Sequence, residues 1–494
     1  MKLFTIGDSV SQGFMSFAAA RTDLSYSTLV AQSLGDVLGK SYKVADWPLG
    51  GHPANLERIF RRLNKFYGAD IAGPFEWGAA LYNIASMLDD VEDYYERGPG
   101  DELEPGPSDN EYYHNVSVRG FNVADAWMVT PKLCKQRIDE SNRDGGGDGW
   151  FSTANASIFR TALEVLNPTR KKSFDQMSAL AWLEHHATTE GVENCIVWLG
   201  SNNALGPILS LDIKLTPNRS DWNPVQSSYQ EREKYNLWRP EHFEIEFVDL
   251  MDRIHKIMEK NKFDDWKVFV GTTPAVTVAP LAKGVGDTQL RNDPFGTLGS
   301  NAQYYQYYTY FPFDKEFAEK GIGRLTLEQV YFIDSTIAQY NKSIKKTVKA
   351  LNGSSKTAKA KKFILVDTSD ALLKIAFKRN NGQPLYKFPA YFESLGRMPN
   401  TKYYHADPNG KLVQGGLFSL DGVHPTAIGH GLMAHEFLKR MKDARGNKIK
   451  VTEPDWDRVF ASDKLWTRPI SLMQEVYQHD KLAEMIMRFC KAIC

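Results

Sequence analysis

The sequence predicts an α/β protein whose core is a largely parallel β-sheet. Short apolar runs alternate along the chain with longer stretches in which apolar residues recur at helical spacing. Such an alternation is typical of strand–helix–strand units, which build parallel sheets with helices on both faces. The composition agrees, because 42% hydrophobic and 24% charged residues are ordinary values for a globular protein.

The expected elements follow one another along the whole chain. Strands are expected at residues 3–6, 42–46, 194–199, 267–270 and 363–366. Helices are expected at residues 26–38, 55–66, 174–188, 241–260, 327–351 and 427–441. Within 55–66, the side chains of Leu56, Ile59, Phe60, Leu63 and Phe66 share one face, as in a helix that packs against a sheet.

Long segments of a different character separate these elements. We expect one domain over residues 1–440, with insertions at about 68–173, 207–240, 281–326 and 376–416, and a helical extension at 441–494. Acidic and glycine- or proline-rich stretches predict loops in the first insertion. The insertions are expected to form a cap or rim at the edge of the sheet. The aromatic run at 304–313 is either a packed loop or edge strand that buries its rings, or the wall of a substrate cleft.

Charge and hydropathy exclude several classes of protein. Lys+Arg and Asp+Glu number 60 each, so the net charge of +0 lacks the footprint of a nucleic-acid-binding protein. No apolar run approaches the roughly 20 residues that a membrane span needs. The N-terminal apolar stretch is too short for a signal peptide, so a cytoplasmic location is expected, or secretion if a leader was removed. Four scattered cysteines do not make a disulfide framework or a metal site.

A candidate nucleophile lies at the end of the first expected strand, in the run Gly7-Asp8-Ser9-Val10. In open α/β sheets the ligand crevice lies beyond the carboxyl ends of the strands, which places Ser9 where a nucleophile is needed. A serine hydroxyl is a weak nucleophile by itself. It needs a histidine base, oriented by a third group, to accept its proton during attack.

A candidate base lies near the other end of the chain, in Asp421-Gly-Val-His424-Pro425. Asp421 and His424 are three residues apart on an expected turn, which is close enough for the carboxylate to orient the imidazole. Pro425 then introduces the last expected helix, since proline is favoured in a first helical turn. The two ends of the chain therefore predict one Ser9, His424 and Asp421 unit.

Acyl transfer also needs hydrogen-bond donors aimed at the developing oxyanion. Two loops at the carboxyl ends of expected strands can supply them, namely Leu49-Gly50-Gly51-His52 and Gly200-Ser201-Asn202-Asn203. Glycine lets a backbone N–H approach closely, and an asparagine amide is a neutral donor.

The four blocks Gly7-Asp8-Ser9, Gly51, Gly200-x-Asn202 and Asp421-x-x-His424 resemble, in this order, those of the GDSL, or SGNH, hydrolase superfamily. The resemblance implies a three-layer α/β/α sandwich around a mainly parallel five-stranded sheet. It also implies Ser9 as nucleophile, His424 as base, Asp421 as its orienting group, and an oxyanion hole of the Ser9 and Gly51 N–H groups and the Asn202 amide. Val10 and Asn203 depart from the family pattern without removing any of these groups, and the choice of Gly51 over Gly50 stays open.

The function expected from these residues is a carboxylic ester hydrolase, an esterase or lipase, that forms an acyl-enzyme without a metal or organic cofactor. The substrate is expected to be a small-molecule, lipid or carbohydrate ester, and a homo-oligomer is compatible with the sequence. Three alternatives remain open: an acyltransferase that uses the same site, a carbohydrate O-acetylesterase, and a binding protein with a vestigial site.

Overall fold

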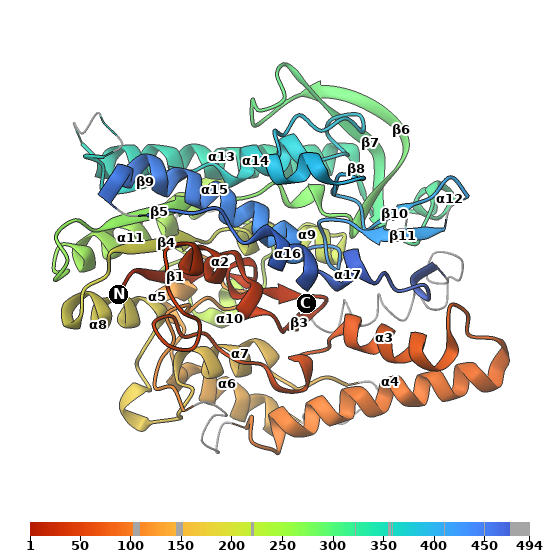
Figure 1. Cartoon of the computed structure of the whole chain (residues 1–494), viewed down its shortest axis with the longest axis horizontal. Helices are drawn as coiled ribbons and strands as arrows, with labels where there is room; N and C mark the ends of the chain where they lie inside the picture. Colours follow the sequence, from red (N-terminus) through yellow and green to blue (C-terminus); the bar gives the residue numbers. More distant parts are fainter. Residues whose placement is uncertain are drawn as a thin grey trace.

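A parallel sheet of four strands forms the centre of the computed structural model, which describes residues 1–101, 109–144, 152–218, 222–321, 323–353, 357, 359–409, 411–448 and 450–474 (Figure 1). The strands are β1 (Leu3–Gly7), β4 (Asn194–Trp198), β5 (Lys267–Gly271) and β9 (Phe363–Val366), side by side in that order. All three pairings are parallel. The prediction of an α/β protein with a mainly parallel sheet is confirmed.

The expected strand at 42–46 is wrong, and another stretch takes its place beside β1. The Thr5 N–H donates to His114 O at 2.9 Å, and the N–H groups of Val116 and Val118 donate back to Thr5 O and Gly7 O. The extended stretch 114–118 therefore runs parallel to β1, although only one of its residues forms a regular bridge. Its two valines are fully buried in the core, which favours this stretch at the position next to β1.

Residues 42–46 lie one place further out. The His114 N–H donates to Lys43 O at 2.8 Å, so the backbone around Lys43 pairs with the 114–118 stretch and not with β1. The sheet thus has four regular strands and one irregular neighbour that comes from the first insertion. A sheet of five regular strands is not formed by the described residues.

Helices cover both faces of the sheet. Alternate strand residues point to opposite sides, and these strands are apolar on both sides, so each face packs against helices. Phe4, Ile6 and Val197 face a core shared with α8 (Ala179–Thr189), α11 (Pro240–Met258) and α13 (Leu327–Leu351). Leu3, Ile196 and Trp198 face a second core shared with α2 (Tyr26–Ser33), α15 (Ala427–Arg445) and α16 (Trp456–Ser462). Helix α13 and strand β9 have the predicted bounds, whereas α2 ends five residues before the predicted end at 38.

The first insertion is largely helical where the structure describes it, and these helices were not predicted from the sequence. It contains α4 (Gly73–Glu96), α5 (Asp125–Met128), α6 (Pro131–Arg143) and α7 (Ser157–Leu166), and the long helix α4 crosses the lower part of Figure 1. Most of the acidic and glycine-rich stretches that predicted loops, at 102–108 and 145–151, lie outside the described residues.

The aromatic run is packed. Residues 304–310 of the run lie in β7 (Asn301–Tyr310), and 311–313 follow it in a turn. β7 is the middle strand of an antiparallel sheet with β6 (Ala282–Asn292) and β8 (Arg324–Thr326), seen at the upper right of Figure 1. Tyr304 and Tyr308 are fully buried, and the Tyr304 hydroxyl donates to Asp334 on α13 at 2.8 Å. The structure supports the interpretation in which these rings are buried, in a central strand and not an edge strand.

The remaining elements are short or lie at the edges of the molecule. They are α1 (Ser9–Gln12), β2 (Phe14–Met15), β3 (Ala18–Ala19), α3 (Leu56–Tyr67), α9 (Asn202–Ser210), α10 (Tyr229–Arg232), α12 (Lys315–Glu319), α14 (Thr368–Ile375), β10 (Tyr404–Ala406), β11 (Leu412–Gly415) and α17 (Lys464–Thr467), with 3-10 turns at Thr22–Leu24, Pro48–Gly50, Lys172–Phe174, Val276–Val278, Ala390–Ser394 and Gly446–Lys448. None of the described helices is both long and apolar enough to span a membrane.

The expected boundary between domain and extension at residue 440 falls inside α15. Helix α16 then packs back on α15, with Trp456, Val459 and Phe460 in the second core. At least as far as residue 474 the C-terminal part therefore belongs to the folded body, and the rest of the expected extension lies outside the described residues.

Candidate active site

Ser9 lies at the carboxyl end of β1, where the strand passes directly into helix α1. The Asp8 side chain caps this helix, because its Oδ1 accepts the Val10 N–H at 3.0 Å. Ser9 is the first helical residue, and the first N–H groups of a helix have no partner inside the helix. Its side chain is only 5% exposed and lines a cavity.

The structure brings Ser9, His424 and Asp421 together in one chain of hydrogen bonds. Ser9 Oγ lies 2.8 Å from His424 Nε2, and His424 Nδ1 lies 3.0 Å from Asp421 Oδ2. Both distances are normal for hydrogen bonds. In this arrangement the imidazole can accept the serine proton on one nitrogen while the carboxylate orients the other.

Asp421 is held as a carboxylate by its own loop. Its Oδ1 accepts the N–H groups of Val423 and His424 at 2.9 and 2.8 Å, and its Oδ2 also accepts the Phe17 N–H at 3.0 Å. Burial raises the pKa of this carboxyl, but the charge of His424 and the hydrogen bonds outweigh burial and hold the pKa below its ordinary value. The ring of Phe14 packs 4.7 Å from the imidazole and fixes its position from the side.

A second buried carboxyl near Ser9 behaves in the opposite way. Burial raises the pKa of Asp8 to about 6, against the lowering influence of Ser201, the Val10 N–H and His424. Asp8 accepts fewer hydrogen bonds than Asp421, so the removal of water is less compensated. Two carboxyls near one serine therefore differ in charge at mildly acidic pH.

Asn202 follows β4 as the first residue of α9, on the same edge of the sheet as Ser9. Its Nδ2 donates to Phe121 O at 3.0 Å, which uses one of its two amide hydrogens. The neighbouring Asn203 accepts the Val123 N–H and donates to Glu246 at 2.9 Å. Both asparagines therefore bind the loop at 121–123.

A buried ion network supports this arrangement behind Asn203. Arg232 bridges Asp125 at 2.8 Å and Glu246 at 3.1 Å, and all three side chains are at most 1% exposed. The Trp238 indole also donates to Glu246. Where the SGNH pattern has an aspartate, this chain thus has an amide whose partner is a buried, paired glutamate.

The structure does not bring Gly51 to Ser9 as an available donor. Its N–H already donates to Pro48 O at 3.0 Å. The residue is pressed against β3, because a Cβ at this position would lie 1.9 Å from Ala19 O. Gly50 lines a separate cavity near Arg58.

Another glycine, which the sequence analysis missed, lies beside Ser9's helix. Gly120 follows the 114–118 stretch that pairs with β1 and has a left-handed φ of 78°. On one side of it the Arg119 N–H donates to Gln12 of α1, and on the other Phe121 O accepts the Asn202 amide. The Gly120 N–H has no acceptor in the described part of the chain. The alternating Val116 and Val118 before this glycine are the strand signal that could have revealed it.

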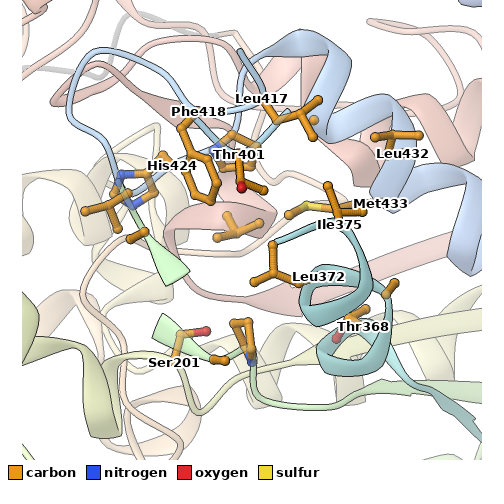
Figure 2. A pocket seen from close by; sticks show the side chains of 18 of the residues that line it. Ser201, Thr368, Leu372, Ile375, Thr401, Leu417, Phe418, His424, Leu432 and Met433 are labelled. Carbon is orange, nitrogen blue, oxygen red and sulfur yellow. The ribbon is translucent and has the colours of Figure 1, made fainter. Parts of the chain in front are cut away.

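The cavity at Ser9 comprises about 1000 Å³ of space between atoms, a figure that includes the open solvent at its mouth. Figure 2 shows Leu372 and Ile375 of α14 facing Leu432 and Met433 of α15, with His424 at one side of the opening. Among the described residues no cluster of three histidine, cysteine, aspartate or glutamate side chains is arranged to hold a metal ion.

Comparisons of the chain with models of known protein families, with curated proteins and with solved structures find no match. The arrangement around Ser9 is therefore interpreted from its own chemistry.

Proposed function

We propose that this protein is a serine ester hydrolase of the SGNH type that works through an acyl-enzyme. The observation that carries the proposal is the continuous chain from Ser9 Oγ through His424 to Asp421, with links of 2.8 and 3.0 Å. Helices on both faces of the parallel sheet and the insertions around its edge are compatible with an SGNH-like sandwich carrying a rim.

The reaction has two steps. His424 Nε2 accepts the proton of Ser9 as Oγ attacks the ester carbonyl, and the imidazolium then protonates the leaving alcohol. Water, deprotonated by the same nitrogen, attacks the acyl-enzyme and releases the acid. Asp421 stays ionised throughout, since it is held as a carboxylate by three backbone N–H groups and by His424.

The oxyanion in this mechanism is stabilised by the N–H groups of Ser9 and Gly120 and by the Asn202 amide, with Gly120 in place of the predicted Gly51. In a parallel sheet, the loops that follow adjacent strands meet at the same edge. The neighbour of β1 on this side is 114–118, so the loop after it reaches Ser9. The Gly120 N–H, which has no acceptor among the described residues, and the second amide hydrogen of Asn202 support this assignment.

The test is active-site labelling combined with hydrolysis. We expect a fluorophosphonate probe to label the wild type on Ser9, and Ser9→Ala to lose both labelling and hydrolysis of p-nitrophenyl butyrate. Ser86→Ala, on helix α4 away from the cavity, is the matched control and keeps both. Hydrolysis that survives in Ser9→Ala, or a folded wild type that neither labels nor hydrolyses any ester, would overturn the proposal. Adding an alcohol to the same assay measures acyl transfer against hydrolysis.

A further inference from the structure

We infer that the cavity beside Ser9 binds the acyl chain of the substrate, so that this protein acts on esters of unbranched aliphatic acids and not on acetyl esters of carbohydrates. The inference rests on the proposed function, because it needs Ser9 as the acylated residue.

The walls of the cavity are almost entirely apolar. Leu372 and Ile375 of α14 face Leu432 and Met433 of α15 (Figure 2). Trp198, at the carboxyl end of β4, and Val276 also line the cavity. Binding in such a cavity is favoured when the ligand buries methylene groups, and the cavity gives a hydroxyl group few partners to replace its hydrogen bonds to water.

Several polar side chains in the wall already have a hydrogen-bond partner in the protein, and the Glu436 carboxylate forms an ion pair with Lys439 at 3.1 Å. Thr368 Oγ1 donates to Thr272 O at 2.7 Å, and Thr401 Oγ1 accepts the Phe377 N–H at 3.0 Å. The Tyr386 hydroxyl donates to Glu436 at 2.8 Å. A sugar placed here would replace few of the bonds to water that its hydroxyl groups lose, and each buried hydroxyl left without a partner disfavours binding.

The shape of the cavity suits a chain. Its α15 wall consists of Gly429, Leu432, Met433 and Glu436, which recur at helical spacing and so lie on one face. From Gly429 to Glu436 this wall extends about 10 Å at 1.5 Å per residue, beginning close to His424 and Pro425. A linear alkyl chain attached at Ser9 can lie along such a wall.

The acyl part of the ester, and not the alcohol, is the part that this cavity fits. The acyl group stays bonded to Ser9 after the alcohol has left and must be held while water attacks. The alcohol has to leave past His424, which protonates it. An apolar cavity beside the nucleophile therefore stabilises the portion of the substrate that remains.

A series of p-nitrophenyl esters from acetate to decanoate tests this inference. Burying one methylene is worth about 0.8 kcal/mol, so we expect kcat/KM to rise about fourfold for each added methylene until the cavity is full. A parallel series of acetate esters with alcohols of increasing length is expected to change much less. A flat acyl series, a preference for acetate, or a rise with alcohol length alone would each overturn the inference.

The variant Leu372→Trp places a bulky ring between α14 and α15, at a position that is only half-buried. We expect it to lower the ratio of kcat/KM for octanoate over acetate at least tenfold. Leu290→Trp, on the exposed face of β6, is the matched control and keeps the wild-type ratio. An unchanged ratio in folded Leu372→Trp would place the acyl chain elsewhere.

A binding measurement separates failure of this inference from failure of the proposed function. Ser9→Ala cannot be acylated, but it keeps the cavity, so we expect it to bind a fluorescent fatty acid and Leu372→Trp to weaken that binding. Ester hydrolysis by wild type without such binding would overturn the acyl-chain inference alone. Binding without any hydrolysis or labelling of Ser9 would overturn the proposed function instead.

Discussion

The two sides of Ser9 are built in different ways. On one side, Asp421 orients His424 through a turn of three residues, and the carboxylate takes two further hydrogen bonds from the same turn. On the other side, the proposed oxyanion donors Gly120 and Asn202 come from segments about 80 residues apart that meet because each follows a neighbour of β1 in the sheet. The first side is a local structure, and the second is a product of strand pairing.

The difference teaches that two kinds of active-site residue differ in how they can be recognised. Two residues that meet within one turn, such as Asp421 and His424, can be recognised from their spacing in the sequence. A donor that reaches the site because of its neighbouring strand can lie anywhere in the chain. The glycine loops are an example. Gly50 and Gly51 follow the expected strand 42–46, whereas Gly120 follows the stretch 114–118 that pairs with β1.

The largest effect is expected on the His424 side. Asp421→Asn keeps the shape of the side chain but presents an amide to His424 Nδ1, which favours the wrong imidazole tautomer. We expect kcat for p-nitrophenyl butyrate to fall about 10⁴-fold. Circular dichroism and the melting temperature check that the protein is folded, and a loss below tenfold in folded protein would contradict the assigned role.

A smaller effect is expected on the other side of Ser9. Asn202→Ala removes one oxyanion donor, and we expect kcat to fall about 10²- to 10³-fold with KM changed much less. Asn83→Ala, on the exposed face of α4, is the matched control and keeps wild-type kinetics. If Asn202→Ala raised only KM, the amide would act in substrate binding and not on the oxyanion.

The roles of Gly120 and Gly51 are distinguished by measuring kcat and melting temperature for an alanine variant of each. Gly120→Ala strains a left-handed backbone beside Ser9, and we expect about a tenfold loss in kcat with a small change in melting temperature. Gly51→Ala brings a Cβ against the Ala19 carbonyl, so it should lower the melting temperature by several degrees. The folded fraction of Gly51→Ala should retain more activity per molecule than Gly120→Ala. The reverse ranking would return the oxyanion role to the 48–52 loop.

The smallest effect concerns stability and pH. The pKa of Asp8 is raised from 3.8 to about 6 by burial, so between these pH values the folded protein binds more protons than the unfolded chain. The contribution of Asp8 to stability is therefore present below about pH 4 and is lost as the pH rises through 6. We expect Asp8→Asn to melt about 3 °C higher than wild type at pH 8.

The pH dependence of melting provides the check. Across pH 4 to 7 the melting temperature of Asp8→Asn should fall less steeply than that of wild type. The exposed Asp89→Asn on α4 serves as the control and keeps the wild-type slope. Equal slopes in wild type and Asp8→Asn would show that Asp8 titrates near its ordinary pKa.

Much of the fold was predictable because its signals are local. The apolar runs at β1, β4, β5 and β9 and the periodic stretch of α13 form the expected elements, since burial of an apolar face needs only a regular spacing. The helices α4 to α7 could not be told from loops by local signals, because they lie between glycine- and proline-rich stretches and α5 is only four residues long. The stretch 114–118 was missed because it lies between them and is short.

The sequence alone was sufficient to identify Ser9, Asp421 and His424 as one unit, because Asp421 and His424 need only a turn to meet and Ser9 stands at the end of an evident strand. It could not show which stretch lies beside β1, and hence that Gly120, whose N–H we propose for the oxyanion hole in place of the predicted Gly51, follows a neighbour of β1. Pairing between strands depends on which of several distant segments buries more apolar surface at that place. The stretch 114–118, with its two buried valines, takes this position beside β1, and only the folded chain shows it.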